Sequence, residues 1–172
     1  MNSLVILELE SGEVNRPSLA TITAAKKISN DVDVLILEND SKDAVARATD
    51  AKNIYHLSTN SENLLAEQMV NLLKELSKKY KFIMAPSGTF SKNFMPRLAA
   101  ILDKQMISDV LKIHDQNTFD RPIYAGNAIA TVKSNESIKL ITIRATAFEP
   151  YSCENGKSNF ISLEKPKEID LN

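Results

Sequence analysis

Cysteine and histidine are nearly absent from this 172-residue chain, which has one cysteine and two histidines. Cys153 has no second cysteine with which to form an internal disulfide, and we expect a reducing compartment. It lies outside the predicted elements, so no catalytic thiolate is predicted there. His56 and His114 lie in separate strand-like runs, without a histidine at helical or hairpin spacing. No metal site is therefore predicted.

A strong net charge and a long apolar run are also missing. The formal net charge is −1, so neither nucleic acid nor an anionic membrane is indicated as a partner. No apolar run approaches the roughly 20 residues that a membrane-spanning helix needs. The opening stretch MNSLVILELE lacks a basic region and reaches Glu8 early, which argues against a signal peptide. We expect a globular, cytoplasmic protein of bacterial type, with no membrane insertion.

Apolar runs and helical patterns alternate over about the first hundred residues, which is typical of a parallel sheet covered by helices. Beyond Gln105, three strand-like runs follow one another with no helix between them. The last two are expected to pair antiparallel through the turn Ser134–Ser137. The predicted fold is therefore an α/β parallel sheet flanked by helices, with additional antiparallel strands at one edge. The strands predicted in the first part are Leu4–Leu9, Val32–Glu38, Asn53–Ser58 and Lys81–Ala85.

The chain is polar and without a sustained period from Pro150 onward. We predict one folded domain over residues 1–149, followed by a polar linker or tail over residues 150–172.

The first strand-to-helix connection, ELESGEVNRPS, is where a dinucleotide-binding fold would place its phosphate loop. It contains one glycine and three glutamates, whereas a pyrophosphate loop uses two or three glycines and few negative charges. An ordinary exposed connection is favoured here.

The stretch SGTFSKN, which starts at Ser87, is a better candidate for binding an anion. Ser87, Thr89 and Asn93 could bind an anion or a nucleotide at the start of a helix, with Lys92 adding positive charge. The stretch lacks the second glycine and the Lys-Ser/Thr pair of a phosphate-binding loop. A structural turn is favoured over an anion site.

The helix that follows is expected to be capped by Asn93 or Ser91, with Pro96 in its first turn. Two alternatives of equal weight are predicted for Arg97. Its side chain forms a fixed ion pair with Asp109, or it extends to the solvent. The buried stripe is predicted to comprise Phe94, Leu98, Ile101 and Leu102.

No nucleophile elbow or paired carboxylates stand out, so no catalytic residue is predicted. The stretch PIYAGNA (Pro122 to Ala128) is more unusual, because Gly126 and Asn127 both tolerate a positive φ and favour a tight turn or a bulge. A sheet edge with such a feature often contacts a partner.

Several of these stretches, in this order, resemble the amino-terminal domain of the electron-transfer flavoprotein alpha subunit. The resemblance extends from Leu4 to about Glu149. The stretches that carry it are LVILELESGEVNRPSLATITAAKKI, the string from Ala85 to Ala100, ISDV (Ile107 to Val110), TFDRPIYAGNAIATVK and ITIRATAFE.

This resemblance implies a Rossmann-like scaffold of the adenine-nucleotide alpha-hydrolase-like kind. It also implies a heterodimer with a beta subunit, which uses FAD to carry electrons from flavin dehydrogenases to a quinone-side acceptor. In the family, a second, carboxy-terminal domain holds most FAD contacts. No residue here matches that domain's motif, so no FAD-binding residue is carried over. Ser91 stands where the family often has glycine, which favours the structural turn.

Two interpretations follow from the resemblance. The first is a truncated or split alpha subunit, a scaffold and assembly domain that binds no FAD alone and whose edge from Tyr124 to Val132 meets the beta subunit or a separate FAD domain. The alternative is a stand-alone adenine-nucleotide-binding module that uses Ser87, Thr89 and Asn93.

Overall fold

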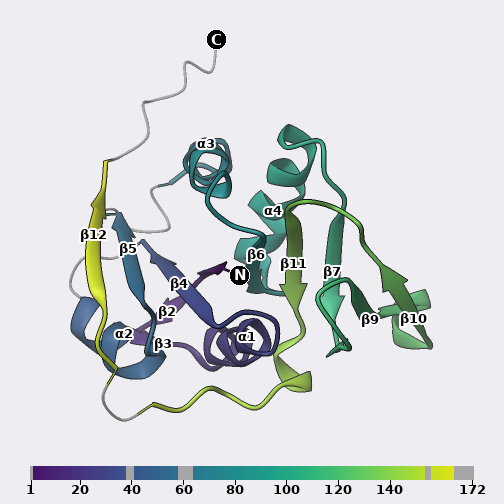
Figure 1. Cartoon of the computed structure of the whole chain (residues 1–172), viewed down its shortest axis with the longest axis horizontal. Coiled ribbons are helices and arrows are strands. Elements are labelled where there is room, and N and C mark those ends of the chain that lie inside the picture. The colour runs from purple at the N-terminus through teal and green to yellow at the C-terminus, as the bar shows by residue number, and fades with distance from the viewer. Residues whose placement is uncertain (1, 38–40, 58–63, 154–155, 165–172) are drawn as a thin grey trace.

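A seven-stranded parallel sheet forms the centre of the molecule in the computed structural model, which describes residues 2–37, 41–57, 64–153 and 156–164 (Figure 1). Its strand order is β12-β5-β4-β1-β6-β11-β7. The sheet therefore confirms the predicted parallel α/β core. Its strands are β1 (Asn2–Ile6), β4 (Asp31–Ile36), β5 (Asn53–Leu57), β6 (Phe82–Pro86), β7 (Met106–Val110), β11 (Lys139–Ile143) and β12 (Asn159–Leu163). Glu38 and Ser58, the predicted ends of two strands, lie outside the described residues.

Helices cover both faces of this sheet, and side chains that alternate along β1 belong to two separate cores. Val5 packs in the cluster that includes residues of α1 (Arg16–Lys26) and α2 (Lys42–Thr49). Leu4 and Ile6 pack in the cluster that includes residues of α3 (Ala66–Ser77) and α4 (Thr89–Ile101). Burial on both faces explains why this strand is continuously apolar in the sequence.

The strands after residue 105 differ in part from the expected antiparallel edge. β11 lies between β6 and β7 and runs parallel to both, so the expected antiparallel pairing of β11 with the preceding strand is wrong. All five β11 residues are buried, which requires a position with both faces covered. The antiparallel strands form a separate three-stranded sheet. They are β8 (Lys112–Ile113), β9 (Thr118–Ile123) and β10 (Ala128–Lys133).

The segment expected to be a polar tail contains a strand. β12 pairs in parallel with β5 and forms one edge of the central sheet. Ile161 and Leu163 pack against the core on the α3–α4 side, so a single apolar face suffices to dock this strand. Between β11 and β12, the chain crosses below α1 and α2 (Figure 1). There, a Cβ on Gly156 would lie 2.1 Å from the backbone oxygen of Ala46.

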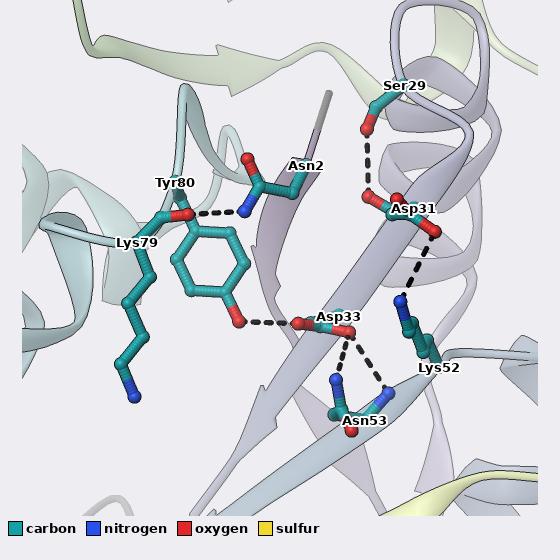
Figure 2. Close-up of polar contacts among 8 residues, drawn as sticks. All are labelled: Asn2, Ser29, Asp31, Asp33, Lys52, Asn53, Lys79 and Tyr80. Atoms are coloured by element: carbon teal, nitrogen blue, oxygen red, sulfur yellow. Dashed lines mark hydrogen bonds and ion pairs between the residues drawn. The ribbon is translucent and has the colours of Figure 1, made fainter.

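A buried polar network joins elements at the amino-terminal edge of the sheet (Figure 2). The Tyr80 hydroxyl donates to Asp33 Oδ2 at 2.5 Å, and both side chains are buried. Asn53 donates to Asp33 Oδ1 through its backbone N–H and its side-chain amide, each at 3.0 Å. Burial, and then the hydrogen bond with Asp33, raise the pKa of Tyr80. This network joins β4, β5 and the connection between α3 and β6 to one another.

Candidate functional site

The carboxyl ends of β1 and β6 mark the point where the chain leaves the sheet toward opposite faces. The two strands are neighbours, but β1 leads to α1 on one face and β6 leads to α4 on the other. In parallel α/β folds, ligands bind in the crevice that such diverging connections create. We therefore take this edge as the candidate functional site, the carboxyl-edge site, which comprises Glu8, Ser87, Gly88, Asp109 and Arg144.

The connection after β1 is a tight hairpin rather than a glycine-rich loop. β2 (Leu9–Glu10) pairs antiparallel with β3 (Glu13–Val14). The two loop residues, Ser11 and Gly12, have φ of 52° and 81°, the left-handed region that such two-residue hairpin turns use. Asn15 then caps α1, because its side chain accepts a hydrogen bond from Ser18 N–H at 2.9 Å.

The residues predicted to bind an anion lie in the turn after β6 and at the beginning of α4. Ser87 is half-buried, its N–H donates to Ile143 O at 2.8 Å, and its hydroxyl is hydrogen-bonded to Asp109. Thr89 is exposed at the first residue of α4, and Asn93 is exposed one turn further along the helix. Ser87 is thus the candidate that joins the carboxyl-edge site.

The start of α4 differs from the sequence prediction. Gly88 is the N-cap, so the prediction of Asn93 or Ser91 is wrong, and Pro96 lies inside the helix rather than in its first turn. The reason is local. Ser91 Oγ accepts a hydrogen bond from Gly88 N–H at 3.2 Å and donates one to the Pro86 carbonyl oxygen. The helix therefore begins at Thr89, three residues earlier than a cap at Ser91 would allow and five residues earlier than a cap at Asn93 would allow.

The buried face of α4 is confirmed for Phe94 and Leu98, which are 1% and 0% exposed. Ile101 is 49% exposed, so its place in the predicted buried stripe is wrong. Arg97 pairs with Glu67 of α3 at the surface and not with Asp109, because it projects from the exposed side of α4.

Glu8 extends from the end of β1 to the beginning of α4. Its Oε1 is buried and has no hydrogen-bond partner among the described residues. A Cβ added to Gly88 would lie 3.1 Å from this oxygen, which is closer than an ordinary van der Waals contact. Glycine at this position therefore avoids a steric conflict with the carboxylate. Burial raises the pKa of Glu8, and a hydrogen bond with the Asn15 side chain partly offsets this effect.

Asp109 and Arg144 form an ion pair across the ends of β7 and β11. Arg144 Nε donates to Asp109 Oδ2 at 3.0 Å, and a second guanidinium nitrogen contacts the same oxygen. Burial alone would raise the pKa of Asp109, but the hydrogen bonds from Arg144 and Ser87 and the charge of Lys92 hold it below its ordinary value. This pair could not be predicted from local sequence patterns, because its partners are 35 residues apart on strands whose order is set by the whole sheet.

The backbone of Asp109 is strained, with a φ of +61° beside an irregularity in the β7–β11 pairing. Its N–H donates to Thr142 Oγ1 at 2.9 Å. This left-handed conformation is uncommon for a non-glycine residue, although aspartate adopts it more readily than most. Here Ser87, Arg144 and Thr142 all contact Asp109, so this residue joins the carboxyl ends of β6, β7 and β11.

We expect Glu8→Gln to raise the urea midpoint of unfolding at neutral pH, with a gain that shrinks as the pH falls. Because the pKa of Glu8 is raised in the folded chain, the folded state binds this proton more tightly than the unfolded state does. The stability that protonation of Glu8 contributes is therefore fully present below the pKa of the unfolded state. It is lost as the pH rises through the pKa of the folded state. The control is Glu10→Gln, an exposed residue of the same hairpin. A gain that is independent of pH would contradict this assignment.

The β9–β10 hairpin exposes two large apolar side chains at its tip and edge. Tyr124 is 79% exposed and Ile129 is 63% exposed. Tyr124, Ala125 and Gly126 all have a positive φ, and Asn127 N–H donates to Tyr124 O at 3.1 Å. The stretch PIYAGNA therefore forms a tight turn, one of the two predicted alternatives. Because β10 is the outer strand of its sheet, the hairpin presents an open edge.

No group of three histidine, cysteine, aspartate or glutamate residues that could hold a metal ion occurs within the described ranges. His114, which follows β8, contacts Asp120 of β9, with 2.9 Å between Nε2 and Oδ2, and His56 is buried in β5. In the part of the chain that the structure describes, no helix is long and apolar enough to cross a membrane.

Comparison with known proteins links this architecture to one family. A family model described as the electron transfer flavoprotein domain matches residues 3–168. The electron transfer flavoprotein subunit alpha of Pseudomonas aeruginosa is 35% identical over 170 residues, which are 96% of this chain and 55% of that protein. The corresponding subunit of Paracoccus denitrificans is 40% identical over 153 residues, which are 87% of this chain and 50% of that protein. The chain thus spans about half the length of the curated relatives it matches.

Proposed function

This chain belongs to the electron transfer flavoprotein domain family, and we propose that it is the amino-terminal scaffold and assembly domain of an alpha-type subunit. The observation that carries the proposal is the family match over residues 3–168, together with similarity to alpha subunits along nearly the whole chain. In this proposal, the chain works in the bacterial-type cytoplasm within an FAD-containing carrier. The carrier takes electrons from flavin dehydrogenases and passes them to a quinone-side acceptor.

The chemistry of the carboxyl-edge site supports a structural role rather than a catalytic one. Asp109 is engaged by both Arg144 and Ser87, so its carboxylate is already committed to partners within the chain. A catalytic nucleophile would need an adjacent base and room for a substrate. We therefore propose that this chain contributes no catalytic residue, and that Ser87, Asp109 and Arg144 hold the ends of β6, β7 and β11 in place.

We also propose that the chain alone binds no FAD, and that a separate FAD domain and a beta subunit complete the site. Two observations support this. The connection after β1 is a hairpin with a single glycine, and the Glu8 carboxylate lies against Gly88 at the start of α4. The alternative, a stand-alone adenine-nucleotide module using Ser87, Thr89 and Asn93, predicts AMP binding much tighter than about 1 mM.

The β9–β10 hairpin is our candidate for the surface that meets the beta subunit. It combines an open strand edge with the exposed side chains of Tyr124 and Ile129, and aromatic residues are enriched where partners bind tightly. Tyr124 also has a left-handed backbone conformation, which bulky residues rarely adopt and which is found mainly at functional sites. This conformation further supports the hairpin as a contact surface.

Co-expression with a beta-type electron transfer flavoprotein subunit tests this proposal. We expect the two chains to co-purify, and we expect Tyr124→Ser combined with Ile129→Ser to weaken the complex by at least about tenfold, because the buried apolar contact is lost. The control is Phe160→Ser, which alters an exposed aromatic residue on the opposite edge of the structure. If the wild-type chain fails to co-purify, the assembly function is wrong. If the double variant binds as well as the control, the hairpin is not the interface.

A further inference from the structure

A cavity of about 370 Å³ lies at the amino-terminal edge of the central sheet, on the edge opposite the carboxyl-edge site. This amino-edge cavity is lined by residues 81–82, 116–117, 135–137 and 139, which come from the starts of β6 and β11 and from the two loops that precede β9 and β11. Two lysines, three side-chain amides and a hydroxyl line it, together with a single carboxylate. Its volume is within the range of small-molecule sites, which is roughly 300–1,000 Å³.

Lys139, the first residue of β11, is a buried ammonium group beside this cavity. The residue is 7% exposed. Within the residues that the structure describes, it has no ion pair, and its Nζ makes one hydrogen bond, which it donates to the Glu136 carbonyl at 2.9 Å. The same Nζ lies 5.6 Å from the centroid of the Phe82 ring. A lysine has three N–H donors, and a buried charge is costly unless it is paired. Lys139 therefore has donors and a charge that suit a bound anion.

The charges around the cavity also favour an anion. Burial lowers the pKa of Lys139, the charge of Glu136 opposes this effect, and the charge of Lys81 adds to it. Lys81 and Lys139 are thus close enough to repel each other. The carboxylate of Glu136 is shared with Lys104, which lies 3.1 Å away in an ion pair. An anion that contacts both cavity lysines would relieve their repulsion.

We propose that the amino-edge cavity binds a small anion that carries a phosphate group or two carboxylates, with Lys139 as its buried anchor and Lys81 as the second cation. Lysine binds both kinds of anion as a point charge. The side-chain amides of Asn117 and Asn135 and the hydroxyl of Ser137 provide neutral donors around the same space. This binding function goes beyond the proposed assembly role and does not depend on it.

The walls of the cavity are already held in place without a ligand. Ser134 N–H donates to the Asn117 carbonyl at 2.8 Å, which joins the loop before β9 to the turn before β11. Lys139 N–H donates to the Lys81 carbonyl at 2.8 Å, and Glu136 N–H donates to Ser134 Oγ at 3.3 Å. Because both loops are tied together and to the sheet, a ligand would lose little of its binding free energy to ordering them.

Calorimetric titration of the purified chain with inorganic phosphate and with succinate, at constant ionic strength, tests the inference. We expect at least one probe to bind the wild-type chain more tightly than about 1 mM, and the tighter of the two identifies the class of anion. Lys139→Met keeps the length of the side chain and removes its charge, so it should weaken this binding at least about tenfold. Asn135→Asp adds a carboxylate at an exposed position of the cavity and should weaken it to a similar extent.

The control is Lys112→Met, which removes an exposed lysine of β8 outside the cavity and should leave binding unchanged. Failure of both probes to bind the wild-type chain would overturn the inference. Unchanged binding in a folded Lys139→Met or Asn135→Asp variant would do so as well, and so would an equal loss in the control, which would mean a general effect of positive charge. Asn135→Asp decides the matter if circular dichroism shows that Lys139→Met does not fold. None of these results affects co-purification with a beta-type subunit, so failure of this inference remains distinct from failure of the proposed function.

Discussion

Replacement of Leu98 with alanine is expected to lower the free energy of unfolding by about 2–5 kcal/mol. Leu98 is 0% exposed and packs in the core between the sheet and the α3–α4 layer. Its truncation removes buried methyl groups and leaves a cavity that the rigid sheet can fill only in part. Urea unfolding followed by circular dichroism measures the change.

Ile101→Ala is the matched control, because it alters a branched apolar residue on the same helix that is 49% exposed. We expect this change to stay within about 0.5 kcal/mol, as is usual for surface positions. Equal losses for the two variants would mean that the buried face of α4 is misassigned.

Replacement of Asp33 with alanine is expected to cost about 2–4 kcal/mol. The change removes the Asp33 acceptor from the buried Tyr80 hydroxyl and from the half-buried Asn53 side-chain amide. Loss of a buried hydrogen-bond partner costs about 1–3 kcal/mol. The loss should appear in urea unfolding, and Tyr80→Phe, which removes one donor and leaves Asp33 with Asn53, should cost less.

Asp31→Ala provides the control on the same strand. Asp31 is exposed, and its carboxylate lies 3.7 Å from Lys52 Nζ in an exposed pair (Figure 2), which contributes little to stability. We expect a loss below about 1 kcal/mol. A similar loss for Asp33→Ala and Asp31→Ala would show that the buried network does not anchor β4 and β5.

The central strands could be predicted from the sequence because their signal is local. A strand buried on both faces is continuously apolar, and Leu4 to Ile6 reads in this way. The place of β11 could not be predicted, because insertion between β6 and β7 depends on contacts between distant strands. β12 was missed because its apolar residues, Ile161 and Leu163, are too few to stand out in a polar segment.

The candidate site was predictable only in part for the same reason. The turn at Ser87 was recognisable from its hydroxyl and glycine residues, and the structure places Ser87 in the carboxyl-edge site. The approach of Glu8 to Gly88 joins segments 80 residues apart, and the sequence indicated only that the first connection is acidic. The pairing of Asp109 with Arg144 likewise depends on strand order, whereas Arg97, the predicted partner, lies on the surface.

The central claim is that this chain is a scaffold that binds no flavin by itself, and reconstitution with FAD tests it most directly. The purified chain is mixed with excess FAD, passed through a desalting column and examined by visible absorbance. We predict a colourless protein fraction, because the Glu8 carboxylate lies against Gly88 and Asp109 is already paired with Arg144 at the carboxyl-edge site. A yellow protein that retains one FAD per chain would contradict the account.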